Sequence, residues 1–208
     1  MSIRRSLALC ATAFALLLSG VPAHAATAPH LEKAVLAGGC FWGMEGVFES
    51  LSGVTQVVSG FAGGDAASAH YETVSTGTTG HAESVEITYD PARIAYHQLL
   101  EVFFTAHDPT TVDRQGPDEG PQYRSAIFYA NDEQRREAQS EIAALTRAHA
   151  FNAPIVTQVV PLHGFYAAEA YHQHYMALHP YSPYILINDK PKVAAVRAKF
   201  PQLVKKTS

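Results

Sequence analysis

The sequence predicts an α/β fold of the α+β kind, a two-layer sandwich with a split βαβ, ferredoxin-like core. Short apolar runs typical of strands are separated by segments in which apolar residues recur at helical spacing. Two strands follow one another between the first two predicted helices, which is the order of a split βαβ unit. No internal repeat or linker divides the chain, so we expect one domain over residues 26–208.

Glycine pairs and turn residues set the limits of the predicted elements. The strands are predicted at residues 33–37, 54–61, 83–89, 125–130 and 155–162. The helices are predicted at residues 42–51, 96–106, 131–148 and 167–178. Residues 65–80 and 108–122 read as two long loops, which in a compact domain often carry function. The lysine-rich tail is expected to be polar and to add little.

The composition is that of an ordinary globular protein, with 47% hydrophobic and 16% charged residues among 208. The formal net charge is −4, so the basic excess of a nucleic-acid-binding protein is absent and nucleic acid is not an expected partner. We expect a monomer.

The first residues have the pattern of a secretory signal peptide. Two arginines precede a mostly apolar run, and Ala23-His24-Ala25 gives the small-x-small cleavage pattern. We expect cleavage after residue 25, so that the mature chain begins at Ala26, lacks Cys10 and keeps Cys40 as its only cysteine. The apolar run is short for a membrane span, which disfavours an N-terminal anchor, and the mature chain offers no other span. We therefore expect an exported, periplasmic protein.

Cys40 is the first candidate functional residue. It lies between a predicted strand and a predicted helix, where unpaired backbone N–H groups and the helix dipole favour a thiolate. Gly38 and Gly39 allow a ligand to approach closely, and Phe41 and Trp42 supply an apolar wall. The alternative is that Cys40 is a small buried core residue, and Trp42 likewise.

Glu83 is the second candidate. Alternation in its strand places Glu83 on the face of Val85 and Ile87, while Ser84 and Glu86 are expected in solvent. Burial raises the pKa of a carboxyl group, so Glu83 would serve as a general acid. The alternative is that Glu83, at the strand's end, simply reaches water. A nucleophilic thiolate beside a carboxylic acid suits attack on an electrophilic centre with protonation of a departing oxygen.

Three motifs carry a wider resemblance: GGCFWG at residues 38–43, GHAE at 80–83 and QYRSAI at 122–127. They are supported by FAGG at 61–64, HDPT at 107–110 and YHQHY at 171–175. With these motifs, which extend over nearly the whole of residues 26–208, the chain resembles the type A peptide methionine sulfoxide reductases. Enzymes of this kind each act on one sulfoxide epimer.

The resemblance implies reduction of methionine-S-sulfoxide, free or in oxidised proteins, with no metal or organic cofactor. Cys40 would attack the sulfoxide sulfur and become a sulfenic acid, and Glu83 would protonate the oxygen. Tyr71 and Tyr123 would donate hydrogen bonds to that oxygen. The substrate-binding residues implied are Phe41, Trp42, Asp118 and His172. Without the resemblance, the two tyrosines could equally lie at a rim, and Asp118 could form a turn.

The chain departs from its apparent relatives in the tail. Many relatives resolve the sulfenic acid with further cysteines near the C-terminus, and none follows Asp189 here. We therefore expect an external thiol reductant, either a thioredoxin-like protein or a small thiol. Pro121 replaces a usual threonine, and His174 replaces a common acidic or amide residue.

Two rival functions remain open from the residues alone. A Cys-dependent hydrolase or acyltransferase would use His81, His107 or His172 as its base. A His-rich metal-binding module is suggested by the 11 histidines. However, His172 and His174 lie two apart, on different faces of a helix, so no metal site is expected there.

Overall fold

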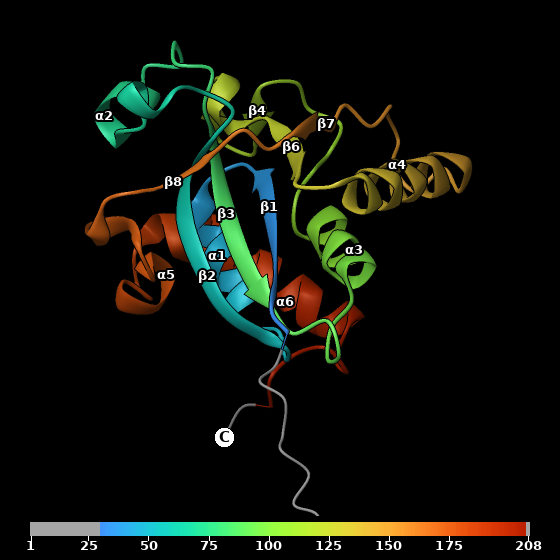
Figure 1. Cartoon of the computed structure of the whole chain (residues 1–208). Coiled ribbons are helices and arrows are strands. Elements are labelled where there is room, and N and C mark those ends of the chain that lie inside the picture. Colours follow the sequence, from blue (N-terminus) through green and yellow to red (C-terminus); the bar gives the residue numbers. More distant parts are fainter. Residues whose placement is uncertain (1–29, 207–208) are drawn as a thin grey trace, which may run out of the picture.

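A computed structural model describes residues 30–206, and the predicted signal peptide at residues 1–25 lies outside the described residues. One sheet of six strands forms the centre, with helices packed against it (Figure 1). The strands of this sheet are β1 (Glu32–Gly38), β2 (Val54–Ala62), β3 (Ala82–Tyr89), β6 (Ser125–Tyr129), β7 (Gln158–Pro161) and β8 (Phe165–Ala167). A separate two-stranded sheet pairs β4 (Arg114–Gln115) with β5 (Asp118–Glu119).

The α-helices are α1 (Phe41–Glu49), α2 (Tyr71–Val74), α3 (Tyr96–Ala106), α4 (Asp132–Arg147), α5 (Tyr175–Leu178) and α6 (Lys190–Lys199). The shorter helical turns are η1 (Ala66–Ser68), η2 (Pro121–Tyr123), η3 (Ala170–His172) and the π-helical η4 (Ile185–Asp189). No helix among the described residues is both long and apolar enough to cross a membrane.

The strand order β7-β6-β1-β3-β2-β8 confirms the predicted core. β3 pairs antiparallel with both β1 and β2, so β1 and β2 run parallel with β3 between them. β6 pairs antiparallel with β1 on its other side, so the β3-α3-β6 unit is split by β1 in the same way. These two interlocked split βαβ units are the ferredoxin-like arrangement. β7, which is parallel to β6, and β8 extend the sheet at its two edges.

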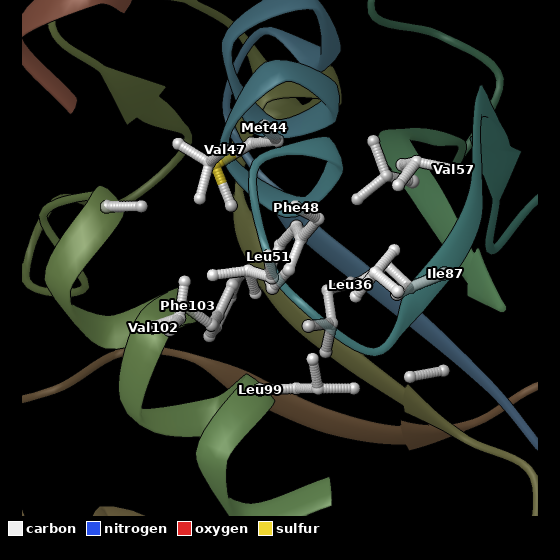
Figure 2. Packing of buried hydrophobic residues seen from close by; sticks show 14 of the residues in the cluster. Leu36, Met44, Val47, Phe48, Leu51, Val57, Ile87, Leu99, Val102 and Phe103 are labelled. Carbon is white, nitrogen blue, oxygen red and sulfur yellow. The ribbon is translucent and has the colours of Figure 1, made fainter. Parts of the chain in front are cut away.

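Helix α1 supplies the centre of the core. Met44, Val47, Phe48 and Leu51 recur at helical spacing and are fully buried against the sheet and α3 (Figure 2). Burying each such side chain contributes about 1.5–3 kcal/mol, which fixes how α1 lies on the sheet. Because Cys40 directly precedes this helix, the core packing also fixes the position of the thiol.

The far face of the sheet is also covered, contrary to the prediction for β3. A second apolar cluster lies there, made by Val35, Ala37, Ala62, Ala82, Ala126 and Phe128 with Phe165 against it. Ser84 was expected in solvent but is buried, and its hydroxyl donates to the carbonyl of Ala82. The alternation in β3 identified the core face correctly but could not show that the opposite face is closed.

The predicted helix at residues 167–178 is wrong. This segment leaves β8 at Ala167 and then forms only the short turns η3 and α5. The side chain of Gln173 holds the segment against β2, because it bonds both the N–H and the carbonyl of Ser59. His174 then adopts a left-handed φ of 54°, which no α-helix allows in its interior.

The expectation of a polar, uninformative tail is also wrong. Residues 185–204 form η4, α6 and a final turn that packs into the core, and Val204 bridges to Leu51. Ile185 and Val196 are completely buried. Lysines and two prolines, Pro191 and Pro201, interrupt the apolar periodicity, so the sequence pattern did not predict this helix.

Candidate active site

Cys40 is the N-cap residue of α1 and follows β1 through a tight glycine turn. Gly39 has φ +87°, and a Cβ at this residue would lie 2.4 Å from Cγ of Gln115. Both the backbone conformation and the lack of space therefore require glycine here. The Cys40 side chain is 7% exposed and lies at the end of the main apolar cluster. The predicted placement at a helix N-terminus is confirmed.

Glu83 enters the same site from β3, where it is paired with Phe61 of β2. Its side chain is 3% exposed, so the alternative in which it reaches water is wrong. The N–H of Phe41, the residue next to Cys40, donates a 3.1 Å hydrogen bond to Oε2 of Glu83. Burial, with smaller contributions from the charges of Asp118 and Asp189, raises the pKa of Glu83 to about 8. The carboxyl group is therefore mostly protonated at neutral pH.

The thiol of Cys40 is also kept neutral. Burial raises its pKa well above the ordinary value, and the nearby carboxyl groups of Glu83 and Asp189 raise it further. The N–H of Trp42 acts in the opposite direction, as the helix N-terminus was expected to do, but its effect is smaller. The prediction of a stabilised thiolate is thus wrong for this state, because desolvation outweighs the helix. The resting pair is a thiol beside a carboxylic acid.

Tyr71 lies in the first segment that was predicted as a loop, and Tyr123 directly follows the second. Tyr71 begins α2 and Tyr123 ends η2. Burial raises the pKa of each phenol, and in both cases Glu83 makes the largest charge contribution. Both remain protonated donors at neutral pH.

Aromatic rings extend from the residues after Cys40 to the segment after β8. We refer to the rings of Phe41, Trp42, Tyr71, His172 and Tyr175 as the aromatic wall. The indole N–H of Trp42 donates a 3.1 Å hydrogen bond to Nδ1 of His172. The indole also stacks on the ring of Tyr175, with the ring centroids 3.8 Å apart. The His172 ring in turn contacts Phe41 and Tyr71, with centroids 5.0 and 4.2 Å apart. The structure therefore brings together Phe41, Trp42 and His172, which the resemblance grouped as substrate-binding residues.

The hydrogen bond from Trp42 also fixes the tautomer of His172. Since Nδ1 accepts, the proton of the neutral ring is on Nε2. Burial lowers the pKa of His172, which keeps the ring neutral. Within residues 30–206, Nε2 is buried and has no hydrogen-bond partner. His172 is thus a donor with a free N–H in the aromatic wall.

Tyr184 and Asp189 also belong to the site, although sequence reasoning missed both. The Tyr184 hydroxyl donates a short hydrogen bond to Oδ2 of Asp118, and its ring meets Trp42 edge-on. Asp189 is completely buried and forms a 3.0 Å ion pair with Lys192. Both residues come from the tail, and no local motif marked them. Tyr184 and Asp189 lie close to the site because the C-terminal segment folds back onto α1.

The hydrolase alternative lacks a base. His81 bonds the Gly64 N–H and the Asp65 carbonyl through its two ring nitrogens. His107 bonds the Phe103 carbonyl and the Ser125 hydroxyl, and burial lowers its pKa to about 4. With the Nδ1 atom of His172 taken by Trp42, each proposed histidine is committed to a group other than Cys40.

Comparisons with known proteins agree with this geometry. The sequence model of the family described as peptide methionine sulfoxide reductase matches residues 32–204. Peptide methionine sulfoxide reductase MsrA 2 of Mesorhizobium japonicum is 55% identical over 177 residues, which cover 85% of this chain and 91% of that protein. MsrA of Halobacterium salinarum is 51% identical over 169 residues, covering 81% of this chain and 96% of its own.

Solved structures show the same fold. Mxr1 of Saccharomyces cerevisiae in its reduced form aligns with a TM-score of 0.69 and 32% identity, over 73% of this chain and 87% of that one. Methionine sulfoxide reductase A of Corynebacterium diphtheriae aligns with a TM-score of 0.67 and 36% identity, over 75% and 79%. With a family match across almost all described residues, the chain belongs to the type A peptide methionine sulfoxide reductases and is an oxidoreductase.

Proposed function

We propose that this protein reduces the S epimer of methionine sulfoxide, free or within proteins, by attack of Cys40 on the sulfoxide sulfur. One observation carries the proposal. The carboxyl group of Glu83 is hydrogen-bonded to the N–H next to Cys40 and is protonated at neutral pH. A thiol and a carboxylic acid together provide both the nucleophile and the proton that the sulfoxide oxygen requires.

The reduction step conserves atoms and electrons. Glu83 protonates the sulfoxide oxygen, and the thiol proton of Cys40 restores the acid. The Cys40 sulfur attacks the activated sulfur and forms an S–S bond, and the oxygen takes a second proton from Glu83 and leaves as water with the electron pair of the S–O bond. That water adds to the Cys40 sulfur and returns a proton to Glu83, which gives the sulfenic acid as the S–S bond breaks. Methionine departs with the electron pair of the S–S bond, so its sulfur is reduced by two electrons and Cys40 is oxidised by two.

The remaining residues bind and orient the substrate. In this proposal Tyr71 and Tyr123 donate hydrogen bonds to the sulfoxide oxygen, whose charge grows as the S–O bond polarises. Phe41 and Trp42 offer an apolar surface for the S-methyl group. Asp118 and His172 supply an acceptor and a free N–H for the polar part of the substrate.

The sulfenic acid requires an external reductant. Cys40 is the only free cysteine among residues 30–206, and no disulfide partner accompanies it in that part of the chain. One thiol condenses with the sulfenic acid, releasing water and leaving a mixed disulfide, and a second thiol then frees Cys40. A thioredoxin-like protein or a small thiol supplies both steps, and the protein works as a monomer without a bound cofactor.

We also propose that the enzyme repairs oxidised proteins after export to the periplasm. The arginines, apolar run and Ala23-His24-Ala25 pattern of the first residues support this proposal. Fractionation of cells that express the full chain, with N-terminal sequencing of the purified protein, tests it. Recovery in the periplasm with Ala26 at the N-terminus is expected, and an uncleaved cytoplasmic protein would contradict it.

The activity is tested with the separate S and R epimers of a blocked methionine sulfoxide, with dithiothreitol as reductant. Wild-type protein should turn over the S epimer alone, and Cys40→Ser should turn over neither. Folded wild-type protein that reduces neither epimer would refute the proposed function. Turnover that persists in Cys40→Ser would refute the role of Cys40.

A further inference from the structure

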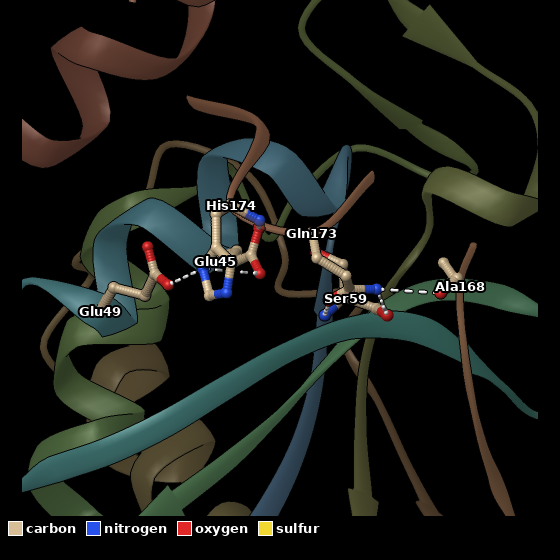
Figure 3. Close-up of polar contacts among 6 residues, drawn as sticks. All are labelled: Glu45, Glu49, Ser59, Ala168, Gln173 and His174. Carbon is tan, nitrogen blue, oxygen red and sulfur yellow. Dashed lines mark hydrogen bonds and ion pairs between the residues drawn. The ribbon is translucent and has the colours of Figure 1, made fainter. Parts of the chain in front are cut away.

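A second cluster of ligand-type side chains lies on α1 and shares no residue with the active site. It consists of Glu45, Glu49 and His174, and Figure 3 shows the imidazole of His174 directed toward both carboxylates. One carboxylate oxygen of each glutamate and one imidazole nitrogen all lie within 4.8 Å of one another. We refer to these residues as the Glu45 cluster.

Glu45 is the buried member of the Glu45 cluster. Its side chain is 1% exposed, and neither a lysine nor an arginine among the described residues pairs with it, which is rare for a buried carboxylate. Oε2 accepts a 2.8 Å hydrogen bond from the backbone N–H of His174, but Oε1 is buried and has no hydrogen-bond partner within the described residues. Burial raises the pKa of Glu45 to about 7. One oxygen of this carboxyl group therefore points into the cluster with its lone pairs unused.

Glu49 and His174 complete the donor set. Glu49 follows Glu45 by one helical turn, on the same face of α1. Nδ1 of His174 lies 2.5 Å from Oε1 of Glu49 and 3.9 Å from Oε1 of Glu45. Two carboxyl groups thus converge on a single imidazole.

The backbone holds these donors in place before any ligand binds. The side chain of Gln173 bonds the N–H and carbonyl of Ser59 and the carbonyl of Ala168, which clamps the segment to β2 (Figure 3). His174 follows in the left-handed conformation that turns its side chain toward α1. A preorganised donor set loses less conformational entropy on binding.

The cluster is open to solvent on one side. A hollow of about 550 Å³ borders Glu49 and His174 and is lined further by β2, Gln173 and Lys205. The side chain of His174 is 58% exposed. The ammonium group of Lys205 donates to the backbone carbonyl of Glu49, so it is engaged outside the carboxylate pair. An ion and its remaining water ligands have a path to the donors.

We propose that Glu45, Glu49 and His174 bind a divalent cation of the zinc class through two carboxylate oxygens and the Nδ1 atom of the imidazole. Imidazole with carboxylates is a donor set that zinc accepts, and three protein ligands leave a position for water. A tetrahedral zinc site with ligand bonds of about 2.0–2.2 Å separates its ligand atoms by roughly 3.3–3.6 Å. The 3.9 Å separation of Glu45 and His174 is already near this range, the Glu49–His174 contact must widen, and the Glu45 and Glu49 oxygens lie within 4.8 Å of each other.

Such an ion would join α1 to the segment that carries the aromatic wall. His172 and Tyr175, which hold Trp42, lie on either side of His174 in the sequence. The ion would thus stabilise the fold and take no part in the reaction, because none of its ligands contacts Cys40 or Glu83. His172, which the sequence did not predict to share a metal site with His174, is not part of this donor set, since its Nδ1 accepts the indole N–H of Trp42.

Titration of the purified protein with ZnCl₂ by calorimetry, after treatment with a chelator, tests the proposal. All variants are made with Cys40→Ser, so that the thiol cannot bind zinc. Glu49→Gln and His174→Gln remove one ligand each at partly exposed residues, and His163→Gln removes an exposed histidine outside the cluster. Circular dichroism confirms that each variant is folded.

The proposal predicts one zinc ion per chain in the Cys40→Ser protein and in the His163→Gln control. Loss of a ligand should weaken binding by about tenfold or more, since even residues that only support ligands contribute 10–100-fold. Zinc should also raise the melting temperature of the control but not that of His174→Gln. Absence of a stoichiometric site in the Cys40→Ser protein, or equal affinity in the control and both ligand variants, would overturn it.

Discussion

The backbone N–H of Phe41 donates a 3.1 Å hydrogen bond to Oε2 of Glu83, which ties the acid on β3 to the first residue after Cys40. Glu83 and Cys40 are far apart in the sequence, and their proximity depends on β3 lying between β1 and β2. The fold thus places the proposed nucleophile and the proposed acid at the same end of the sheet. Burial at that end keeps both groups neutral.

Replacing Glu83 with Gln should abolish the proton donor and leave the site's shape intact. The amide oxygen still accepts from Phe41, but the side chain no longer transfers a proton. General acid catalysis contributes about 10²–10⁴-fold, and kcat should fall by that factor. Glu86→Gln is the matched control, because Glu86 lies on the same strand and only pairs with Lys33. Steady-state kinetics would contradict the role of Glu83 if both variants lost activity equally.

Glu83 should also destabilise the folded protein as the pH rises. Its pKa is about 8 in the folded state against an ordinary value of 4.5, so the folded state binds more protons than the unfolded state between these values. The free energy of unfolding must then fall as the pH rises through this window. Glu83→Gln lacks the penalty and should gain stability relative to its parent.

Urea unfolding at about pH 5 and about pH 8.5 measures this gain, with Cys40→Ser in both proteins so that the thiol does not titrate. The variant should be the more stable protein by a margin that grows with pH. A margin that stays constant between the two pH values would show that Glu83 is not buried as a neutral acid.

Tyr184→Phe should weaken substrate binding more than chemistry. The hydroxyl of Tyr184 bonds Asp118, and its ring supports Trp42. Loss of one hydrogen bond to a charged group costs about 1.5–3 kcal/mol, so kcat/KM should fall at least tenfold, mainly through KM. Tyr181→Phe is the control, since Tyr181 is 84% exposed. If the two variants had equal kinetic constants, Tyr184 would have no role in substrate binding.

Gly43→Ala should disturb the site, whereas Gly46→Ala should not. A Cβ on Gly43 would lie 2.2 Å from the carboxylate of Asp189, which is completely buried and paired with Lys192. A Cβ on Gly46 would meet the end of the flexible Met176 side chain instead. Overpacking costs about 1–3 kcal/mol, so Gly43→Ala alone should lower the melting temperature and activity. Similar melting temperatures for the two variants would contradict the packing of η4 against α1.

The sequence pattern predicted those features that depend on short-range periodicity. The core face of α1, the burial of Glu83 in β3 and the position of Cys40 before a helix all follow from spacing within one element. The resemblance then added Tyr71, Tyr123, Asp118 and His172, which no periodicity marks. The structure places His172 against Trp42, and Asp118 against a tyrosine of the tail.

What the pattern could not predict depends on contacts between distant segments. Tyr184, Asp189 and His174 approach α1 only because residues 168–204 wrap back along it, held by Gln173 and by Val204. The protonation of Cys40 was mispredicted for the same reason. A helix N-terminus is visible in the sequence, whereas the burial and the two carboxyl groups that oppose it are not.

In the proposed reaction, Cys40 accepts the sulfoxide oxygen and Glu83 is the acid. Single-turnover reaction of the reduced protein with excess S-sulfoxide, without any added thiol, tests the role of Cys40. We predict one methionine per protein and one oxygen atom on Cys40, trapped by a sulfenic-acid reagent and located by peptide mass spectrometry. Continued turnover without a reductant, or methionine formed while Cys40 stays unmodified, would exclude this reaction.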